Sequence, residues 1–236
     1  MPRSASKGSL PVYLQISERL IREIGAGRLP DGERLAPERE MAASLSISVG
    51  TLRKALAELE KKGLLERRHG SGNYVRASGR AEGVYAFFRI ELIEGGGLPT
   101  AELIDLRRMP KPDDVPAFGV SPDAHRIRRL RSLDGIPSVL EEIWLDGSYA
   151  EALDPDDMSE SLYLYYRQAF DLAITRAQDS VGVAPAPDWA PDQFPPQPGT
   201  ACGFIERLSR AQDNKIAEVS RNWFDANTVR YVSRMR

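Results

Sequence analysis

The sequence predicts an α+β protein of two domains, in which helices come first and strands follow. Before residue 76, apolar residues recur at steps of three and four, as they do along one face of a helix. After residue 84 they fall in short runs between turn sequences, and Asp134-Gly135 marks a hairpin. A length of 236 residues fits two domains. We expect a first domain at 1–76, a linker at 77–86 and a second domain at 87–236.

The composition excludes several classes of protein. It is 42% hydrophobic and 28% charged, as in ordinary soluble proteins. No apolar run approaches the roughly 20 residues that cross a bilayer, so we expect a cytoplasmic protein with no membrane partner. The single cysteine, Cys202, cannot form an internal disulfide and fits a reducing compartment. With only His69 and His125 beside it, no zinc or histidine-rich metal site is expected, and no phosphate-loop or dinucleotide motif indicates a cofactor.

The first helix is predicted at 11–26, followed by the outline of a winged helix-turn-helix at 35–75. In the first helix Val12, Ile16, Leu20 and Ile24 repeat every four residues, and glycines follow. Pro37 suits the first turn of the next helix, and the Ser48 hydroxyl can cap the one after it. That last helix has an apolar stripe made of Val49, Leu52, Ala55, Leu56 and Leu59. Two glycines in the tip at 69–72 predict a hairpin, the wing.

The amino end of the second helix of this motif has the composition of a DNA-reading surface. Gly50, Thr51, Arg53 and Lys54 lie opposite the apolar stripe, and in helix-turn-helix proteins this end enters the major groove. Arg53 can reach a phosphate or a guanine edge. An ordinary amphipathic helix has the same pattern, so this observation alone leaves both interpretations open.

The charge distribution agrees with a DNA-binding N-terminal part. Residues 1–76 hold 14 Lys and Arg against 9 Asp and Glu, whereas the rest of the chain holds 18 against 25. Such a division is typical of a nucleic-acid-binding end joined to a different domain. The excess is modest, so strong binding requires two copies on one DNA.

The first 76 residues resemble the GntR family of bacterial transcription regulators. The resemblance rests on Tyr13-x-x-Ile16, the Gly27-x-Leu29 turn, Leu35-x-x-Glu38-Arg39-Glu40-Met41-Ala42, Ser48-x-x-Thr51-x-Arg53-x-Ala55-Leu56, and Gly63-Leu64-Leu65 through Gly70-x-Gly72. It implies contacts with operator DNA, and our candidate DNA-binding residues are Arg39, Ser48, Gly50, Thr51, Arg53, Lys54, Arg68, His69 and Gly70. Arg39 and His69 could equally be idle surface residues. Two departures are Val49, where the family often has arginine, and Ala36-Pro37, which removes a hydroxyl cap.

The second domain is expected to be an antiparallel sheet with a few helices. Strands are predicted at 125–133 and 136–145 around Asp134-Gly135, and at 202–210, 216–224 and 228–234. A helix is predicted at 161–170, and the proline-rich stretch 185–198 is an irregular connection.

This half resembles the UTRA domain, the effector-binding part of the HutC-type branch of GntR regulators. The residues that carry the resemblance are Arg129-Leu-Arg131, Asp134-Gly135-Ile136-Pro137 leading to Glu141, Ser161-Leu162-Tyr163, Arg207, and Asp213-x-x-x-x-Glu218-x-Ser220-Arg221. It implies a sheet similar to that of chorismate lyase, used to bind a ligand. The implied effector-binding residues are Arg129, Arg131, Glu141, Ser161 and Glu218, with Phe88 and Arg89 at the lip of the pocket.

The chemistry of these residues suits an anionic ligand. Arg129 and Arg131 are two apart on a strand, so both project from one face and can grip a phosphate or carboxylate. A strict two-residue turn pairs Arg129 with Leu140, so pairing it with Glu141 requires a bulge or a longer loop. The alternative is a surface ladder of ion pairs formed by Arg128, Arg129, Arg131, Glu141 and Glu142. Trp223-Phe224-Asp225-Ala226-Asn227 replaces a Tyr-Tyr-Arg-Gly-Asp stretch of many relatives, which leaves the effector open.

We therefore expect a homodimeric transcription regulator, a repressor, that binds a palindromic operator in double-stranded DNA and responds to a small anionic metabolite such as a phosphorylated sugar or carboxylate. Two alternatives remain. In an enzyme of chorismate-lyase-like fold, Glu141 or Glu218 with Arg129 would act on an acidic substrate. The sequence offers no nucleophile–base pair, so no catalytic residue is expected. An effector-independent DNA-binding protein is the other alternative.

Overall fold

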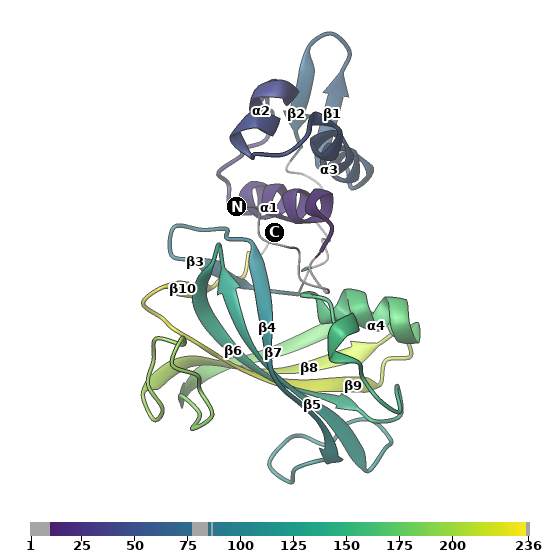
Figure 1. The fold of residues 1–236 in the computed structure, drawn as a ribbon, viewed down its shortest axis with the longest axis vertical. Coiled ribbons are helices and arrows are strands. Elements are labelled where there is room, and N and C mark those ends of the chain that lie inside the picture. The colour runs from purple at the N-terminus through teal and green to yellow at the C-terminus, as the bar shows by residue number, and fades with distance from the viewer. Residues whose placement is uncertain (1–9, 77–84, 86, 235–236) are drawn as a thin grey trace. The chain divides into compact units, whose positions relative to one another are not determined.

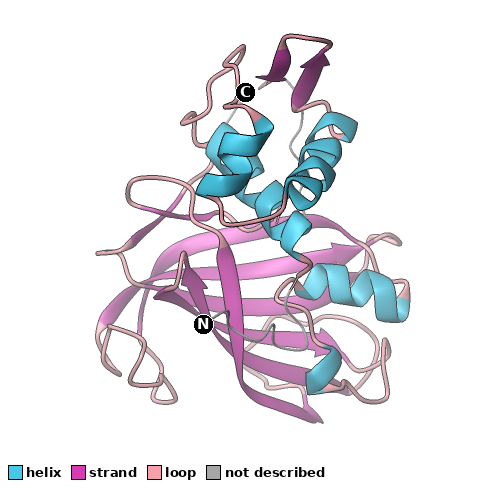
Figure 2. Ribbon diagram, turned by 45° about the horizontal axis from the view of Figure 1, so that its top comes forward, coloured by secondary structure: helices cyan, strands magenta, loops and turns pink. Residues whose placement is uncertain are grey.

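The computed structural model describes residues 10–76, 85 and 87–234, and within them the chain forms two compact units. One unit contains residues 10–98 together with the segment from Val232, and the other contains Pro99–Tyr231. Figures 1 and 2 show helices concentrated in the first and strands in the second, which confirms the predicted α+β class. The predicted linker at 77–86 lies, apart from Tyr85, outside the described residues.

The N-terminal unit contains the predicted winged helix-turn-helix. Its elements are α1 (Val12–Gly25), α2 (Glu38–Ser44), α3 (Val49–Lys61), β1 (Leu65–Arg68) and β2 (Gly72–Val75), followed by the short β3 (Ile90–Leu92). Leu20, Leu52, Leu56, Leu59 and Val75 are buried together in its core, so the helical apolar stripes face inward as the sequence predicts. Val12 is the exception: it begins α1 and is 50% exposed, because the core does not reach the first turn of this helix.

The two caps of the helix-turn-helix differ. The Ser48 side chain accepts a hydrogen bond from the Thr51 backbone N–H at 3.0 Å, which confirms its predicted role at the start of α3. Pro37 is the N-cap residue of α2, one position before the expected first turn, and it makes no side-chain cap hydrogen bond. The helix begins one residue later because Pro37 has an extended ψ of 138°.

The segment that follows the wing packs against α1. Arg22 of α1 donates to the backbone carbonyls of Phe88, Ile90 and Gly96, and Arg28 donates to that of Glu94. The first compact unit extends to Leu98. The domain bounds 1–76 and 87–236 stay a prediction. Sequence spacing does not reveal these arginine contacts.

The second unit is built on a six-stranded antiparallel sheet with the order β4-β5-β6-β9-β8-β7. The strands are β4 (Pro99–Pro110), β5 (Asp123–Leu133), β6 (Ile136–Asp146), β7 (Ile174–Pro185), β8 (Ala201–Ala211) and β9 (Ile216–Phe224). The unit also contains a 3-10 turn at Pro155–Asp157, α4 (Leu162–Phe170) and β10 (Val229–Tyr231), which is shorter than the strand predicted there. Neither β4 nor β7 is predicted from the sequence. Both are edge strands that are exposed over much of their length, so neither has a clear apolar pattern.

The β5–β6 hairpin combines a two-residue turn with a bulge. Leu133 pairs with Ile136, and Asp134 and Gly135 have φ values of 48° and 84°, as the tight turn requires. The register then shifts between Arg131 and Ser132. The shift places Glu141, and not Leu140, opposite Arg129, which resolves the question of register in favour of the bulge.

Candidate functional site

The predicted DNA-binding residues of the helix-turn-helix lie on the surface of the N-terminal unit. Ser48, Gly50, Arg53 and Lys54 are exposed in the first turns of α3, and Thr51 is half-buried among them. Arg39 is exposed on α2. The amino end of α3 therefore presents small and cationic groups to solvent, as the sequence predicts.

Arg53 is held by a neighbouring carboxylate, which the sequence did not indicate. Its Nε donates to Glu38 Oε2 at 2.6 Å, and the Arg53 side chain remains 63% exposed. The hydrogen bond from Arg53 is the largest cause that lowers the pKa of Glu38, and the Asn73 side chain of the wing also contributes. Exposed ion pairs are weak and exchange readily, so Glu38 can orient Arg53 without preventing it from binding another anion.

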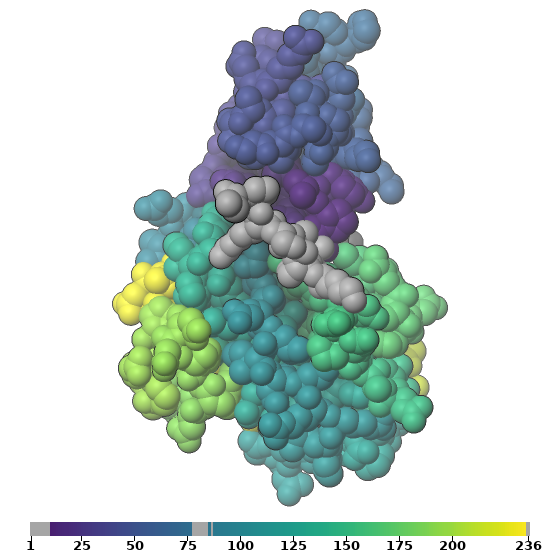
Figure 3. Space-filling model, viewed as in Figure 1, coloured from purple at the N-terminus to yellow at the C-terminus, as the bar shows by residue number. Residues whose placement is uncertain are grey.

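The wing presents its cationic residues on an ordered hairpin. The Arg68 guanidinium lies 4.3 Å from the centre of the Tyr74 ring and pairs with Glu66 at 3.1 Å. His69 and Gly70 are exposed at the tip, which projects from its unit in Figure 3. Gly70 has a φ of 70°, a conformation that favours glycine.

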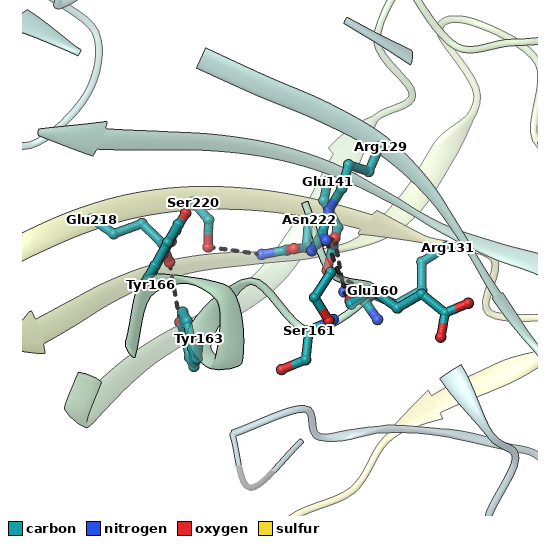
Figure 4. A network of polar contacts seen from close by, with 11 residues as sticks. Arg129, Arg131, Glu141, Glu160, Ser161, Tyr163, Tyr166, Glu218, Ser220 and Asn222 are labelled. Atoms are coloured by element: carbon teal, nitrogen blue, oxygen red, sulfur yellow. Dashed lines mark hydrogen bonds and ion pairs between the residues drawn. The ribbon is translucent and has the colours of Figure 1, made fainter. Parts of the chain in front are cut away.

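In the second unit, Arg129, Arg131 and Glu141 form a buried ion cluster on one face of the sheet (Figure 4). Arg129 Nη2 donates to Glu141 Oε2 at 2.6 Å, and Arg131 Nε donates to Glu141 Oε1 at 2.9 Å. The three residues are only 3–6% exposed, so the surface-ladder alternative is wrong for them. Burial follows from their place on the inner strands β5 and β6 beside the segment that begins α4.

That segment contributes a carbonyl to the cluster and a cap to α4. The backbone carbonyl of Glu160 accepts hydrogen bonds from Arg129 and Arg131, each at 3.3 Å. The next residue, Ser161, is buried and caps α4 by accepting from the Leu164 N–H. Figure 4 shows Ser161 and Glu160 next to the two arginines, as the prediction of a shared site requires.

The electrostatics of the cluster favour an anion. Burial raises the pKa of Glu141, but the adjacent Arg129 and Arg131 outweigh it and lower that pKa to about 2. Two cations and one carboxylate leave a net positive charge in a buried place. Among the described residues, Arg129 Nε is a buried donor without a hydrogen-bond partner. Such a donor is costly unless another group accepts from it.

Glu218 lies farther along the same face, among hydroxyl groups. It is 2% exposed and accepts hydrogen bonds from Tyr163 (3.1 Å), Tyr166 (3.0 Å) and Ser209 (3.1 Å). Burial raises its pKa. The two tyrosines and Ser209 were not among the predicted site residues. The spacing of three between Tyr163 and Tyr166 places both on one face of α4, but only the fold brings that face onto Glu218.

A polar row on β9 connects the two clusters. Asn222 pairs in register with Glu141, and its side chain donates to Ser220 Oγ at 3.3 Å. Ser220, Asn222 and Glu218 are two residues apart, so their side chains share one face of the sheet (Figure 4). At about 3.3 Å per residue, the row extends for about 13 Å.

Phe88 and Arg89, the expected pocket lip, belong to the N-terminal unit. The Arg22 guanidinium lies 5.4 Å from the centre of the Phe88 ring, and the Arg89 carbonyl accepts from the Val232 N–H at 2.9 Å. Their predicted role with the effector stays a prediction.

Over the described parts of the chain, no three histidine, cysteine, aspartate or glutamate residues are arranged to hold a metal ion. In the same parts, no helix is both long and apolar enough to span a membrane.

Comparisons with known proteins match both halves of the chain. Residues 12–75 match the family model described as bacterial regulatory proteins, gntR family, and residues 94–230 match the UTRA domain. The HTH-type transcriptional regulator SmoD of Agrobacterium fabrum is 59% identical over 97% of this chain and 98% of its own. The HTH-type transcriptional repressor NagR of Bacillus subtilis is 26% identical over 96% and 95%. The crystal structure of the possible transcriptional regulator YydK of Bacillus subtilis has the same fold, with a TM-score of 0.55 and 20% identity over 96% of this chain and 100% of that one.

Proposed function

The chain belongs to the GntR family of bacterial transcription regulators and carries a UTRA domain, and we propose that it is a homodimeric repressor released from its operator by a small anionic metabolite. The name of NagR, a repressor, supports the direction of control. The buried Arg129–Glu141–Arg131 cluster, with its net positive charge, carries the proposal of an anionic effector.

The cluster is organised for binding before a ligand arrives. Glu141 holds both guanidinium groups in place, so little side-chain entropy is lost when an anion joins them. The polar row that ends at Glu218 offers hydroxyl and amide groups over about 13 Å. This length suits a ligand with an acidic group at one end and a hydroxylated body, such as a phosphorylated sugar or a sugar acid.

The DNA-binding role is assigned to the amino end of α3 and the wing. The exposed Arg53 and the residues 68–70 offer the cationic and small groups that contact phosphates and base edges. Two copies of the winged helix-turn-helix on one palindromic operator provide the affinity that a single, weakly basic copy lacks. Binding of the ligand weakens binding of DNA when the two favour different arrangements of the two winged helix-turn-helix units in the dimer.

The site is proposed to bind its ligand without catalysing a reaction on it. Two arginines lower the pKa of Glu141, burial raises that of Glu218, and the Ser209 hydroxyl that donates to Glu218 is fully buried. This agrees with the regulator names of the relatives.

A two-stage experiment tests the proposal. A thermal-shift screen of phosphorylated sugars and sugar acids first identifies compounds that stabilise the full chain. Fluorescence anisotropy with the promoter DNA next to the gene then measures whether a stabilising compound releases the protein. Binding of promoter DNA that no stabilising compound weakens would contradict control by an effector, and absence of DNA binding would contradict the regulator itself.

A further inference from the structure

A hollow of about 510 Å³ lies between the start of α2 and the wing, within the N-terminal unit. Arg34, Leu35, Ala36, Pro37 and Glu38 line one side, and residues 67–73 line the other. Arg68, His69 and Gly70 in its lining are predicted to bind DNA, but no role is predicted for Arg34.

The position of Arg34 is set by the wing. The Arg34 backbone forms a bridge with Tyr74, and the flanking hydrogen bonds Leu35 N–H to Asn73 O (2.9 Å) and Val75 N–H to Glu33 O (2.8 Å) fix the segment along β2. The Arg34 side chain then crosses the wing at Gly72. A Cβ at that position would lie 3.1 Å from Arg34 Nε, and Gly72 has a φ of 124°, so glycine provides both the space and the backbone conformation.

The charge of the hollow is positive. Arg34, Arg67 and Arg68 line it, and Glu38 is its single lining carboxylate. Arg67 pairs with Glu60 at 3.2 Å and Arg68 with Glu66 at 3.1 Å. Among the described residues the structure records no carboxylate within ion-pair distance of Arg34. The hollow thus contains a cation that is available to an incoming anion.

The hollow lies between the two surfaces that are proposed to contact DNA. Glu38 in its wall is bonded on one side by Arg53 of α3, and the wing residue Asn73 interacts with it on the other. A duplex presents grooves that are separated by ridges of sugar and phosphate. A protein that touches groove edges with two neighbouring elements must therefore straddle a ridge.

We propose that this hollow seats one sugar–phosphate strand of the operator, with Arg34 as its phosphate ligand and Gly72 as the residue that positions Arg34. The inference rests on the proposed binding of DNA and adds a contact that carries no sequence information, because phosphates are the same at every base pair. Arg34 is therefore expected to raise the affinity for DNA, and the salt dependence of that affinity, by the same amount whatever the sequence of the duplex.

The test uses the full chain and a fluorescein-labelled 30-base-pair duplex of mixed sequence, titrated by anisotropy between 50 and 200 mM NaCl. For Arg34→Ala we expect affinity at 50 mM NaCl to fall about tenfold and the slope of log K against log salt to become shallower by about one for each bound head. Arg34→Lys keeps the charge and is expected to keep the slope. Arg19→Ala removes an exposed arginine of α1 that does not line the hollow, and it is the matched control.

The outcomes separate this inference from the function on which it rests. If the wild type and Arg19→Ala bind equally and Arg34→Ala has the same slope as both, the hollow does not hold a phosphate. If Arg53→Ala weakens binding in that same experiment, binding of DNA stands without the hollow. If the wild type binds no duplex even at 50 mM NaCl, both proposals fail.

Discussion

Replacing Glu141 by glutamine is expected to destabilise the sheet unit strongly. The substitution keeps the shape of the side chain but leaves Arg129 and Arg131, which are 5% and 3% exposed, facing each other without a counter-charge. The magnitude follows from the pKa of Glu141, which falls from 4.5 to about 2 in the folded protein. At about 1.4 kcal/mol for each tenfold change in proton affinity, this corresponds to about 3 kcal/mol. Measured costs of breaking a buried ion pair are about 3–5 kcal/mol.

The assay is unfolding by heat or urea at pH 7, followed by tryptophan fluorescence. All three tryptophans, Trp144, Trp189 and Trp223, belong to the sheet unit, so the signal reports on that unit. A loss of about 3 kcal/mol lowers the melting temperature by roughly 6–12 °C for a protein of this size. Sulfate at about a hundred times its dissociation constant should return about 2.7 kcal/mol, because it supplies the missing negative charge.

Glu142→Gln is the matched control for Glu141→Gln. Glu142 is the next residue on β6 and points to the opposite face. It pairs with Arg128, whose side chain is 21% exposed, and also accepts a hydrogen bond from Trp144 Nε1 at 3.3 Å. Water can solvate Arg128 when its partner is lost, so the expected cost is about 1 kcal/mol. Equal losses in the two variants, or no difference in their response to sulfate, would refute the role of Glu141 as the counter-charge of a buried anion site.

Acid should remove the difference between wild type and Glu141→Gln. A carboxylate whose pKa is lowered on folding contributes stability above its unfolded pKa of 4.5, and this contribution is lost as the pH falls through about 2. The gap in urea midpoint between the two proteins should therefore narrow between pH 4.5 and pH 2. A gap that does not change over this range would contradict the assignment.

Three further predictions concern the separation of DNA binding from effector binding, and the pKa of Glu218. Arg53→Ala should weaken operator binding by about 1–3 kcal/mol in a gel-shift titration at fixed salt, and an unchanged titration would contradict its reading of a base. Arg129→Ala combined with Arg131→Ala should leave DNA binding intact and abolish release by the effector, whereas loss of DNA binding itself would argue against separate sites. Because burial raises the pKa of Glu218, the stability that it contributes is present below pH 4.5 and declines as the pH rises through its folded pKa. Glu218→Gln mimics the neutral acid, so its urea midpoint should fall less than that of the wild type as the pH rises above 4.5, and equal falls would contradict a raised pKa.

Much of this protein follows from local patterns that can be read along the chain. The stripe of α3, the Ser48 cap and the Asp134-Gly135 turn depend on residues a few positions apart, and the structure has all three. The projection of Arg129 and Arg131 from one face follows from the two-residue period of a strand. These interactions join residues that are close in sequence, so they do not depend on contacts between distant parts of the chain.

The composition of the sites depends on contacts between distant residues. A one-residue bulge decided that Glu141 lies opposite Arg129, and the packing of α4 on the sheet brought Tyr166 to Glu218. The pairing of Arg53 with Glu38 joins two helices, and hydrogen bonds from Arg22 join α1 to the carbonyls of Phe88 and Gly96. No period or spacing encodes these neighbours, because each depends on register and packing across the fold. Burial raises the pKa of both carboxyl groups, but two arginines lower that of Glu141 to about 2, whereas the pKa of Glu218 stays raised.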